Sequence, residues 1–445
     1  MSVASEPVPA RARPVSALPP GVKLPSYLQA ACFLLWRDKL LTYMRRRYGD
    51  VFTLNLPVFG RSVMVARPDL VKQIFTAPAD VLVFGEISPL GDLIGPGSLF
   101  SMDGAEHLRE RRLILPAFHG ERMKGYEAII EQEARREMAA WPEGEQFATM
   151  PGFMRITLNS ILRAVFGAEA DDLADLADVL PPLVTLASRL TLLPLLRRDL
   201  GPGSPGRRLN RLRDRYDSII DRMIDASLAD PRLEERDDVM SMLLRAHYDD
   251  GSSMSRGAIK DELLTLLAAG HETTATSLAW AVERLRRNPW ILRRLVDEAR
   301  EEDAGNALRM ATIQEVQRTR PVIPATGRHA MEDFQLGEWV VPQGHHIVVA
   351  ARMIHNDPRY FELPMQFQPD RFLGVKADTY TWLPFGGGLR RCPGAAFAHM
   401  EMDVVLRVLL REFDLDSTDA PGEAWQDRGV AFAPGDGGLA VVGRR

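Results

Sequence analysis

The sequence predicts a mainly α-helical protein with small β-sheets, an α+β fold built as one large domain. From about Pro68 to Leu285, apolar residues recur at spacings of three and four, the period of one helix face. Shorter runs with the residue types of strands flank this helical part, at 50–66, 338–342 and 345–351. No later segment resembles a long linker, so we expect residues 26–445 to form a single domain after an N-terminal arm, 1–25.

The composition narrows the possible partners and the compartment. The chain has 445 residues, of which 46% are hydrophobic and 26% charged, the balance of a globular protein. Its net charge of -5 gives no general attraction to nucleic acid. Its two cysteines, Cys32 and Cys392, exclude a disulfide scaffold and an iron–sulfur cluster held by the protein. We therefore expect a cytoplasmic protein with no nucleic-acid partner.

The first 25 residues are rich in proline and lack the apolar core of a signal peptide, which predicts a flexible or extended arm. The following run, SYLQAACFLLW at 26–36, is apolar but ends at Arg37. It is shorter than the roughly 20 apolar residues that span a bilayer, so we expect no transmembrane anchor. The run suits a helix that is packed into the domain or rests on a surface, and the packed helix is favoured.

The other elements follow in chain order. Residues 50–66 predict a β-hairpin with its turn at 57–60, and the sequence GPGSPG at 201–206 separates two helices. Residues 254–287 predict one helix of roughly 34 residues, near 50 Å long. Strands are expected at 338–342 and 345–351, and a last helix at about 395–411.

The long helix is apolar on nearly every face and should be buried, but polar and small residues interrupt its middle. The interruption is Ala269-Gly270-His271-Glu272-Thr273-Thr274. One interpretation is a helix–helix contact at Gly270, with hydroxyls bonded to carbonyls one turn earlier. The other is that small residues make room for a flat ligand while Glu272 and Thr273 handle protons. The helix alone does not decide between them.

A second unusual stretch is the loop FGGGLRRCPG at 385–394, which contains Cys392. A thiolate can ligate heme iron, and its charge needs hydrogen bonds and dipoles for support. Glycines let backbone N–H groups approach a sulfur, and a helix that begins after Cys392 places its positive end nearby. The alternative is a buried structural cysteine, the usual role of a lone cysteine.

The spacing in this loop decides between the two. Phe385, Gly388, Arg390, Cys392 and Gly394 fill the pattern FxxGxRxCxG, and with it the sequence resembles the cytochromes P450. Other motifs of that family appear in the family's order. These are an H-x-x-x-R segment from His107 to Arg111, the interruption at 269–274, an E-x-x-R pair at Glu315 and Arg318, and a P-x-R-F segment at 369–372.

The resemblance implies the cytochrome P450 fold, with heme b between the long central helix and the cysteine loop. Cys392 would be the iron ligand, with Phe385, Gly386 and Gly394 around it. Ala269 and Gly270 would leave space for O2, and Thr273 and Glu272 would be the catalytic residues that deliver protons. The residues implied as contacts of the heme propionates are His107, Arg111, Arg328 and Arg390. Arg371 would join the Glu315–Arg318 pair in a buried ionic group.

The activity implied is that of a monooxygenase that inserts one oxygen atom of O2 into an apolar organic substrate, such as a lipid, steroid, terpenoid or aromatic compound. Substrate contacts would come from the segments 83–97, 180–196 and 322–326. Electrons would come from a ferredoxin or flavodoxin-like donor with its reductase. A basic face for this donor would comprise Arg109, Arg112, Arg122, Lys124 and Arg391.

Two other functions remain open at this point. One is a heme-thiolate peroxygenase or isomerase, which needs no electron donor; the pairing of Glu272 with Thr273 argues against it. The other is a heme-binding or lipid-binding protein without turnover. The leucine-rich segment 180–196 also permits peripheral contact with a membrane, although packing inside the protein explains it as well.

Overall fold

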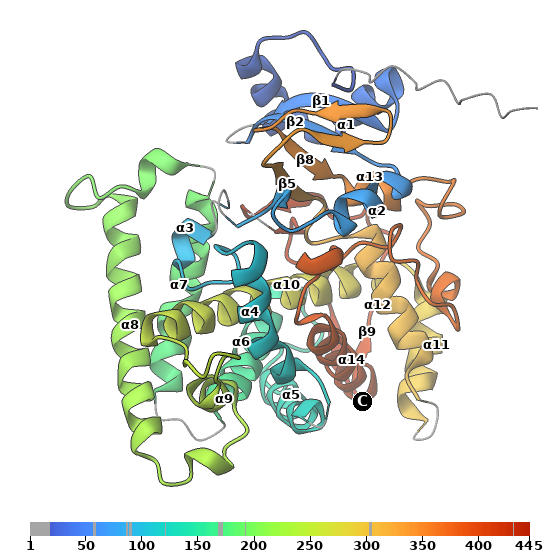
Figure 1. Ribbon diagram of the computed structural model, residues 1–445. Helices are drawn as coiled ribbons and strands as arrows, with labels where there is room; N and C mark the ends of the chain where they lie inside the picture. The colour runs from blue at the N-terminus through green and yellow to red at the C-terminus, as the bar shows by residue number, and fades with distance from the viewer. Residues whose placement is uncertain are drawn as a thin grey trace, which may run out of the picture.

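The computed structural model describes residues 18–56, 59–85, 88, 91–120, 122–167, 172–191, 193–301, 305–429 and 431–445. It is mainly helical with small sheets, as predicted (Figure 1). The largest sheet, with most of the N-terminal elements, lies at one end of the molecule, and the helices form the remainder. The N-terminal arm lies outside the described residues up to residue 17.

The largest sheet has the strand order β1-β2-β8-β5-β3. Its strands are β1 (Val51–Leu56), β2 (Gly60–Val65), β3 (Leu82–Val83), β5 (Thr326–Ala330) and β8 (His346–Val349). The hairpin β1–β2 is antiparallel, as predicted, and β8 then adds parallel to β2. One face of this sheet carries a core of its own, formed with α2 (Pro68–Thr76).

The helical part begins with short helices and continues with longer ones that carry the main core. The elements up to the central helix are α3 (Gly91–Ile94), α4 (Gly104–Ile114), η1 (Leu115–Phe118), α5 (Arg122–Met138), α6 (Met150–Phe166), α7 (Leu173–Leu190), η2 (Pro194–Arg197), α8 (Pro205–Ala229), η3 (Leu233–Glu235) and α9 (Val239–Arg245). The predicted break at 201–206 lies directly before and at the start of α8. The helical periodicity between Pro68 and Leu285 is therefore confirmed.

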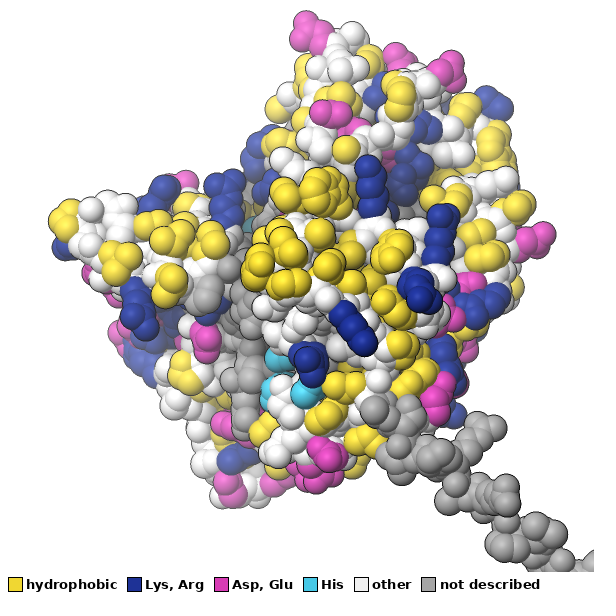
Figure 2. Space-filling view, turned by 90° about the horizontal axis from the view of Figure 1, so that it is seen from above, with side chains coloured by type: hydrophobic (Ala, Val, Ile, Leu, Met, Phe, Trp, Pro, Cys, Tyr) yellow, Lys and Arg dark blue, Asp and Glu magenta, His cyan; other side chains and the backbone are white. Residues whose placement is uncertain are grey.

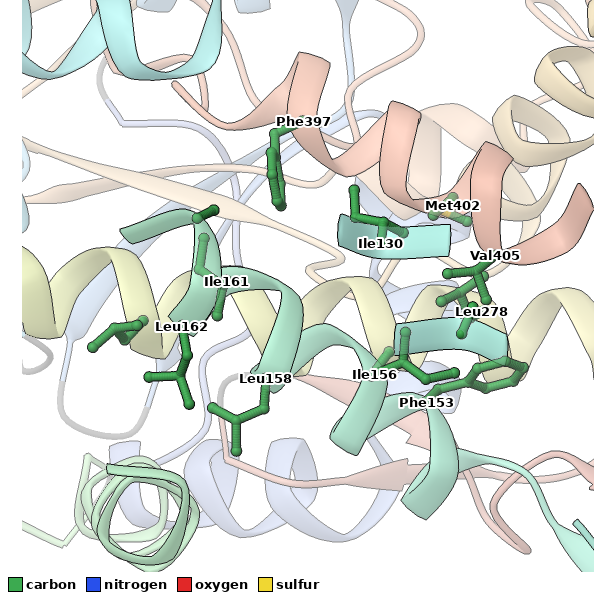
Figure 3. Packing of buried hydrophobic residues seen from close by; sticks show 14 of the residues in the cluster. Ile130, Phe153, Ile156, Leu158, Ile161, Leu162, Leu278, Phe397, Met402 and Val405 are labelled. Atoms are coloured by element: carbon green, nitrogen blue, oxygen red, sulfur yellow. The ribbon is translucent and has the colours of Figure 1, made fainter. Parts of the chain in front are cut away.

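The central helix α10 (Arg256–Arg286) is the predicted long helix, shortened by about a residue or two at each end. It begins where the Ser255 hydroxyl accepts a hydrogen bond from the Ala258 N–H, a typical N-cap. Figure 3 shows how apolar side chains of α5, α6, α10 and the C-terminal helix α14 (Ala395–Glu412) gather into one core. Because α10 is enclosed in this core, any polar group in its middle must be satisfied or functional.

The C-terminal part contains further helices and small two-stranded sheets. Its helices are α11 (Pro289–Arg300), α12 (Ala307–Thr319), α13 (Ala351–His355), η4 (Pro369–Phe372) and η5 (Gly388–Arg390). The small sheets pair β6 (Phe334–Leu336) with β7 (Trp339–Val341), β12 (Leu439–Ala440) with β4 (Phe147–Ala148), and β13 (Val442–Arg444) with β9 (Phe413–Leu415). The strands predicted at 338–342 and 345–351 are β7 and β8, each shorter than expected.

The last two-stranded sheet is a hairpin of β10 (Trp425–Asp427) and β11 (Phe432–Pro434), fixed on three sides. The indole of Trp280 in α10 donates to the Phe432 carbonyl at 2.9 Å. The Phe432 N–H donates to the Val322 carbonyl at 3.0 Å. At Gly429, a Cβ atom would lie 2.6 Å from the Ser188 carbonyl oxygen of α7. This hairpin was not predicted from the sequence.

The N-terminal helix corrects the favoured interpretation of residues 26–36. Helix α1 (Ser26–Tyr48) forms there but leaves most of its large apolar side chains exposed, and it departs from helical geometry at Trp36. The exposed fraction is 68% for Leu35 and 55% for Trp36. Upstream, Gly21 forms a bridge with Thr53, whose N–H donates to the Pro20 carbonyl, so the end of the arm is extended along β1. Among the described residues, no helix is long and apolar enough to cross a membrane.

Candidate functional site

The middle of α10 presents a narrow accessible strip in an otherwise buried helix. Ala269 is exposed, and Ala268, Gly270 and Thr273 are partly exposed, while the residues on both sides of them along the helix are buried. Ala269 and Thr273 share one face, since residues four apart are neighbours on a helix, and Ala268 and Gly270 flank this face on either side. The strip is formed by small side chains and one hydroxyl, so it can approach a flat ligand closely.

The motif at 269–274 has features of both interpretations, the helix–helix contact and the surface for a flat ligand. A Cβ atom at Gly270 would lie 3.3 Å from Ile161 of α6, so this glycine serves a tight helix–helix contact. The Thr273 hydroxyl donates to the Ala269 carbonyl at 2.8 Å, and Thr274 donates to the Gly270 carbonyl at 3.2 Å. The contact and the back-bonded hydroxyls are therefore present, and Thr273 still lies on the accessible strip.

Glu272 is paired with a residue that the sequence did not indicate. Its carboxylate lies 2.9 Å from Nε of Arg428, at the tip of the β10–β11 hairpin. The side chain of Glu272 is 10% exposed and that of Arg428 is 32% exposed. The carboxylate thus has a charged partner on the side of α10 that faces the hairpin.

The cysteine loop depends on its glycines for two reasons. Gly386 and Gly388 have φ angles of 63° and 64°, the left-handed region that favours glycine. At Gly387 a Cβ atom would lie 2.2 Å from the Phe75 ring, and at Gly388 it would lie 2.1 Å from the Phe75 carbonyl oxygen. The close approach of this loop to the end of α2 therefore requires glycine, independently of the sulfur.

Substitution of Gly388 tests this close approach. We expect Gly388→Ala to lower the free energy of unfolding by about 2–5 kcal/mol, from left-handed strain plus the clash with Phe75. Gly374→Ala is the matched control, because Gly374 has a φ of 71° but no atom within 4 Å of its added Cβ. The control should lose only about 1–2 kcal/mol. Equal losses for the two variants in urea denaturation would contradict the steric role of Gly388.

The surroundings of Cys392 favour a thiolate through several groups, against the effect of burial. Burial raises the pKa of the thiol, whereas the Gly394 N–H and the charges of Arg111 and Arg391 lower it. The Cys392 N–H donates to the Phe385 carbonyl at 3.0 Å, which closes the loop, and α14 begins at Ala395. Cys392 is accessible to solvent in this structure.

Phe385 lies at the other end of this loop and supports it. Its ring packs edge-on against His399, with the ring centroids 5.0 Å apart, and against Trp382 at 6.0 Å. His399 belongs to α14 and hydrogen-bonds to Gln317 of α12 at 3.0 Å. The predicted position of Phe385 next to the cysteine is thus maintained by aromatic contacts with two other elements.

A small polar cavity brings together three of the four residues predicted to contact propionates. His107, Arg328 and Arg390 line it, together with Asp103 and Phe75. Burial lowers the pKa of Arg328 to about 10, and burial also lowers the pKa of Arg390. Arg390 pairs with Asp103, whereas Arg328 has no salt bridge among the described residues. A buried guanidinium in this position is suited to a bound anion.

Two members of the predicted set, His107 and Arg111, differ from expectation, the first in charge and the second in place. Burial, with the nearby charges of Arg390 and Arg111, lowers the pKa of His107 to about 3. His107 is therefore neutral near pH 7 and can contact a carboxylate only as an N–H donor. Arg111 does not line the cavity; its guanidinium donates to the Arg391 carbonyl at 2.6 Å, beside the cysteine loop. Its position supports the sulfur rather than the polar cavity.

These residues suit a heme. The cysteine sulfur receives a backbone N–H, as a thiolate ligand requires, and an accessible strip of small residues lies on α10. The polar cavity supplies buried guanidinium groups that match carboxylates. Cys392 would hold the iron, and Arg328, Arg390 and His107 would hold the propionates, with Asp103 displaced from Arg390.

The predicted ionic group around Glu315 is present and buried. Its carboxylate accepts two hydrogen bonds from Arg318, at 2.7 and 2.8 Å, and a third from the Gln368 N–H at 2.9 Å. Nε of Arg371 lies 3.2 Å from the same carboxylate, near enough for an ion pair although not aligned for a hydrogen bond. Arg318 also donates to the His355 carbonyl at 2.7 Å. This group ties α12 to the segment that precedes the cysteine loop.

His355 makes this region sensitive to acid. Burial, with the charge of Arg318, lowers the pKa of His355 to about 3, and its Nε2 accepts the Leu383 N–H at 2.9 Å. Below about pH 6.5 the unfolded chain binds a proton there that the folded chain does not, so stability falls as the pH falls. We expect the titration of His355 to lower the free energy of unfolding by about 2 kcal/mol between pH 7.5 and pH 5.

The measurement compares urea denaturation of the wild type and His355→Gln at both pH values. The stability advantage of the wild type should shrink by about 2 kcal/mol at pH 5, because only the wild type carries this titrating group. An advantage that is independent of pH would contradict a neutral, buried His355.

The basic residues proposed for an electron donor are largely paired already. Arg109 lies 2.8 Å from Asp250, Arg112 lies 3.6 Å from Asp249, and Arg122 lies 3.8 Å from Asp237. Arg391 is exposed next to Cys392. The face is therefore mixed in charge, with its basic component concentrated nearest the cysteine loop.

Two residues of the site escaped the sequence analysis. Asp103 contacts Arg390 and accepts the backbone N–H groups of Phe84 and Gly85, at 2.8 and 2.6 Å. Arg428 contacts Glu272 across 156 positions of sequence. Neither belongs to a motif. The only sequence signal for Asp103 is that it is a charged residue four positions before the motif that begins at His107.

The chain is similar in sequence and in fold to known proteins. A family model described as "Cytochrome P450" matches residues 34–436. The chain is 52% identical over 438 residues to "Putative cytochrome P450 138" of Mycobacterium tuberculosis, covering 98% of each chain. It is 36% identical to "Putative cytochrome P450 137" of the same species, covering 94% of this chain and 89% of the relative. The solved structure "Retinoic acid bound cyanobacterial CYP120A1" shares the fold, with a TM-score of 0.85 at 22% identity over 96% of this chain and 99% of that one.

Proposed function

The chain belongs to the cytochrome P450 family, a family of heme-thiolate monooxygenases, and we propose that it oxidises an apolar organic substrate with electrons from a separate donor protein. The observation that carries this proposal is the cysteine loop, where Cys392 receives the Gly394 N–H beside Arg111 and Arg391. When bound, heme b supplies the O2 chemistry. The residues of the chain bind it, orient the substrate and move protons.

We assign proton handling to Thr273 and Glu272. Thr273 lies on the accessible strip of α10 and holds its proton toward the Ala269 carbonyl, from which it can turn by rotation about one bond. Glu272 directly precedes it in the chain and contacts Arg428, which reaches solvent. A hydroxyl at the strip and a carboxylate beside a partly exposed cation form the two ends of a route for protons.

Replacing Thr273 tests this assignment. We expect Thr273→Ala to lower the yield of oxygenated product per NADPH consumed by about tenfold or more, with hydrogen peroxide released instead, because proton delivery is impaired. Ser277→Ala is the matched control, since the Ser277 hydroxyl also donates to a backbone carbonyl one turn earlier in α10. The acceptor is the Thr273 carbonyl, at 3.0 Å. Equal yields for wild type and Thr273→Ala would count against a role for this hydroxyl.

The proposed substrate is a lipid, steroid, terpenoid or aromatic compound. Its contacts would come from the segments 83–97, 180–196 and 322–326, of which residues 86, 87, 89, 90 and 192 lie outside the described part of the chain. Leu180, Leu183 and Val322 are buried and apolar. Fatty acids, steroids, terpenoids and polar compounds are screened by the absorption change on displacement of the iron-bound water, which identifies the class that binds. Binding mainly of the polar compounds would contradict the proposal.

The proposed electron donor is a ferredoxin or flavodoxin-like protein with its reductase. Support comes from Arg391, exposed beside Cys392, and from Arg111 close by. An acidic donor would be attracted to this part of the surface, with an association rate that falls as salt rises. Turnover that is driven by peroxide but by no donor protein would favour the peroxygenase instead.

We also propose peripheral contact with an anionic membrane through α1. Figure 2 shows hydrophobic side chains gathered beside Lys and Arg on the end of the molecule that carries this helix. This surface comprises the exposed side chains of Leu34, Leu35 and Trp36, with Lys39, Arg46 and Arg47 on the same helix. Sedimentation with vesicles of anionic but not zwitterionic lipid is expected, and no binding to either would contradict this contact.

A further inference from the structure

The ion pair between Arg428 and Glu272 joins a hairpin tip to the polar centre of α10. Arg428 lies 156 positions after Glu272, and its Nε donates to Glu272 Oε1 at 2.9 Å. Glu272 is largely buried, so its carboxylate depends on this contact for a counter-charge. The titratable neighbour of Glu272 within α10 is His271, whose pKa burial lowers and whose Nδ1 lies 2.8 Å from the Leu267 carbonyl.

The hairpin holds Arg428 in place without help from the ion pair. The backbone N–H of Arg428 donates to the Ala431 carbonyl at 2.9 Å, and the Gly429 N–H donates to the Asp427 carboxylate at 2.7 Å. On the outer side, Arg37 of α1 lies 3.3 Å from Asp427 and stacks on Phe432 at 4.7 Å. The backbone that carries the guanidinium is thus held by contacts that do not involve Glu272.

We propose that Arg428 is a positioning residue, which fixes the orientation of the Glu272 carboxylate at the outer end of the proton route. This inference rests on the proposed function of Glu272 and extends it to a residue outside the sequence motifs. A guanidinium that donates through Nε holds a carboxylate in a defined plane, which a lysine cannot do. Because Arg428 is partly exposed, it also places the carboxylate next to solvent.

The first test is spectroscopic and does not depend on turnover. The infrared carboxylate band of Glu272 is defined by subtracting the spectrum of Glu272→Gln from that of the parent protein. We expect this band to shift in Arg428→Gln, because the ion pair is lost, and to move only partly in Arg428→Lys. Arg37→Gln is the matched control, since it removes an arginine that contacts the same hairpin but not Glu272. A band that is unchanged in Arg428→Gln would overturn the proposal.

The second test measures the consequence for proton delivery, with dodecanoic acid as the probe substrate and a ferredoxin with its reductase as donor. Arg428→Gln should lower the yield of hydroxylated product per NADPH by about five- to tenfold, less than Glu272→Gln does, because Arg428 acts through Glu272. In a Glu272→Gln background, Arg428→Gln should change nothing further.

The outcomes separate the two claims. An equal loss in both backgrounds would mean that Arg428 acts on the substrate and not on Glu272, which overturns this inference and leaves the proposed function intact. If the Glu272 band shifts in Arg428→Gln but Glu272→Gln leaves the product yield unchanged, the ion pair is confirmed and the proposed proton route is contradicted.

Discussion

Glu315→Gln is expected to destabilise the protein by about 3–5 kcal/mol, the cost of leaving a buried charge without its partner. Glu315 and Arg318 are both fully buried, and the side chain of Arg371 is 12% exposed. Removal of the single carboxylate leaves two guanidinium groups facing each other. It also leaves one amide oxygen in place of the two carboxylate oxygens that accept from Arg318 and the Gln368 N–H. The effect should appear as a lower midpoint in urea denaturation.

Asp370→Asn is the matched control for this prediction. Asp370 adjoins Arg371 and accepts two hydrogen bonds from Arg294, at 2.7 and 2.9 Å, but both side chains are exposed. A pair of this kind contributes about 1 kcal/mol or less. If Glu315→Gln does not fold, Arg371→Gln, which keeps the inner pair, should fold and show an intermediate loss. Similar losses for Glu315→Gln and Asp370→Asn would contradict the structural role of the buried group.

Cys392→Ala is expected to abolish monooxygenase activity, with a loss of at least about a thousandfold, because the thiolate ligand of the iron is removed. The fold should persist, since the loop is closed through the backbone hydrogen bond from Cys392 to Phe385, which the substitution leaves in place. Cys32→Ala in α1 is the control and should leave activity unchanged. Activity in Cys392→Ala comparable with that of the wild type would remove Cys392 from the site.

Much of the fold was predictable because its signals are local. The length of α10 follows from an apolar pattern that continues on both sides of its polar interruption, and the hairpin β1–β2 follows from two strand-like runs around a turn. The placement of α1 was not predictable in the same way. Its run of apolar residues is the same whether the helix packs or remains exposed, and only tertiary contacts decide.

The site shows the same division. Cys392, Thr273 and Glu315 belong to motifs whose spacing is fixed by chemistry, so the sequence identified them. Arg428 and Asp103 reach the site through long-range packing, and their residue type is common at the surface. Arg111 belongs to a motif but lies beside the cysteine loop and not in the polar cavity, because the direction of its side chain depends on the contact with Arg391.

The central claim is that the Cys392 thiolate ligates heme iron, and one absorption measurement tests it most directly. The purified protein is reduced with dithionite and exposed to carbon monoxide. Thiolate ligation predicts the strongly red-shifted Soret band of the cytochromes P450, and this band should be absent in Cys392→Ala. A band typical of a neutral or histidine-like ligand in the folded wild type, or folded wild type that binds no heme, would contradict the claim.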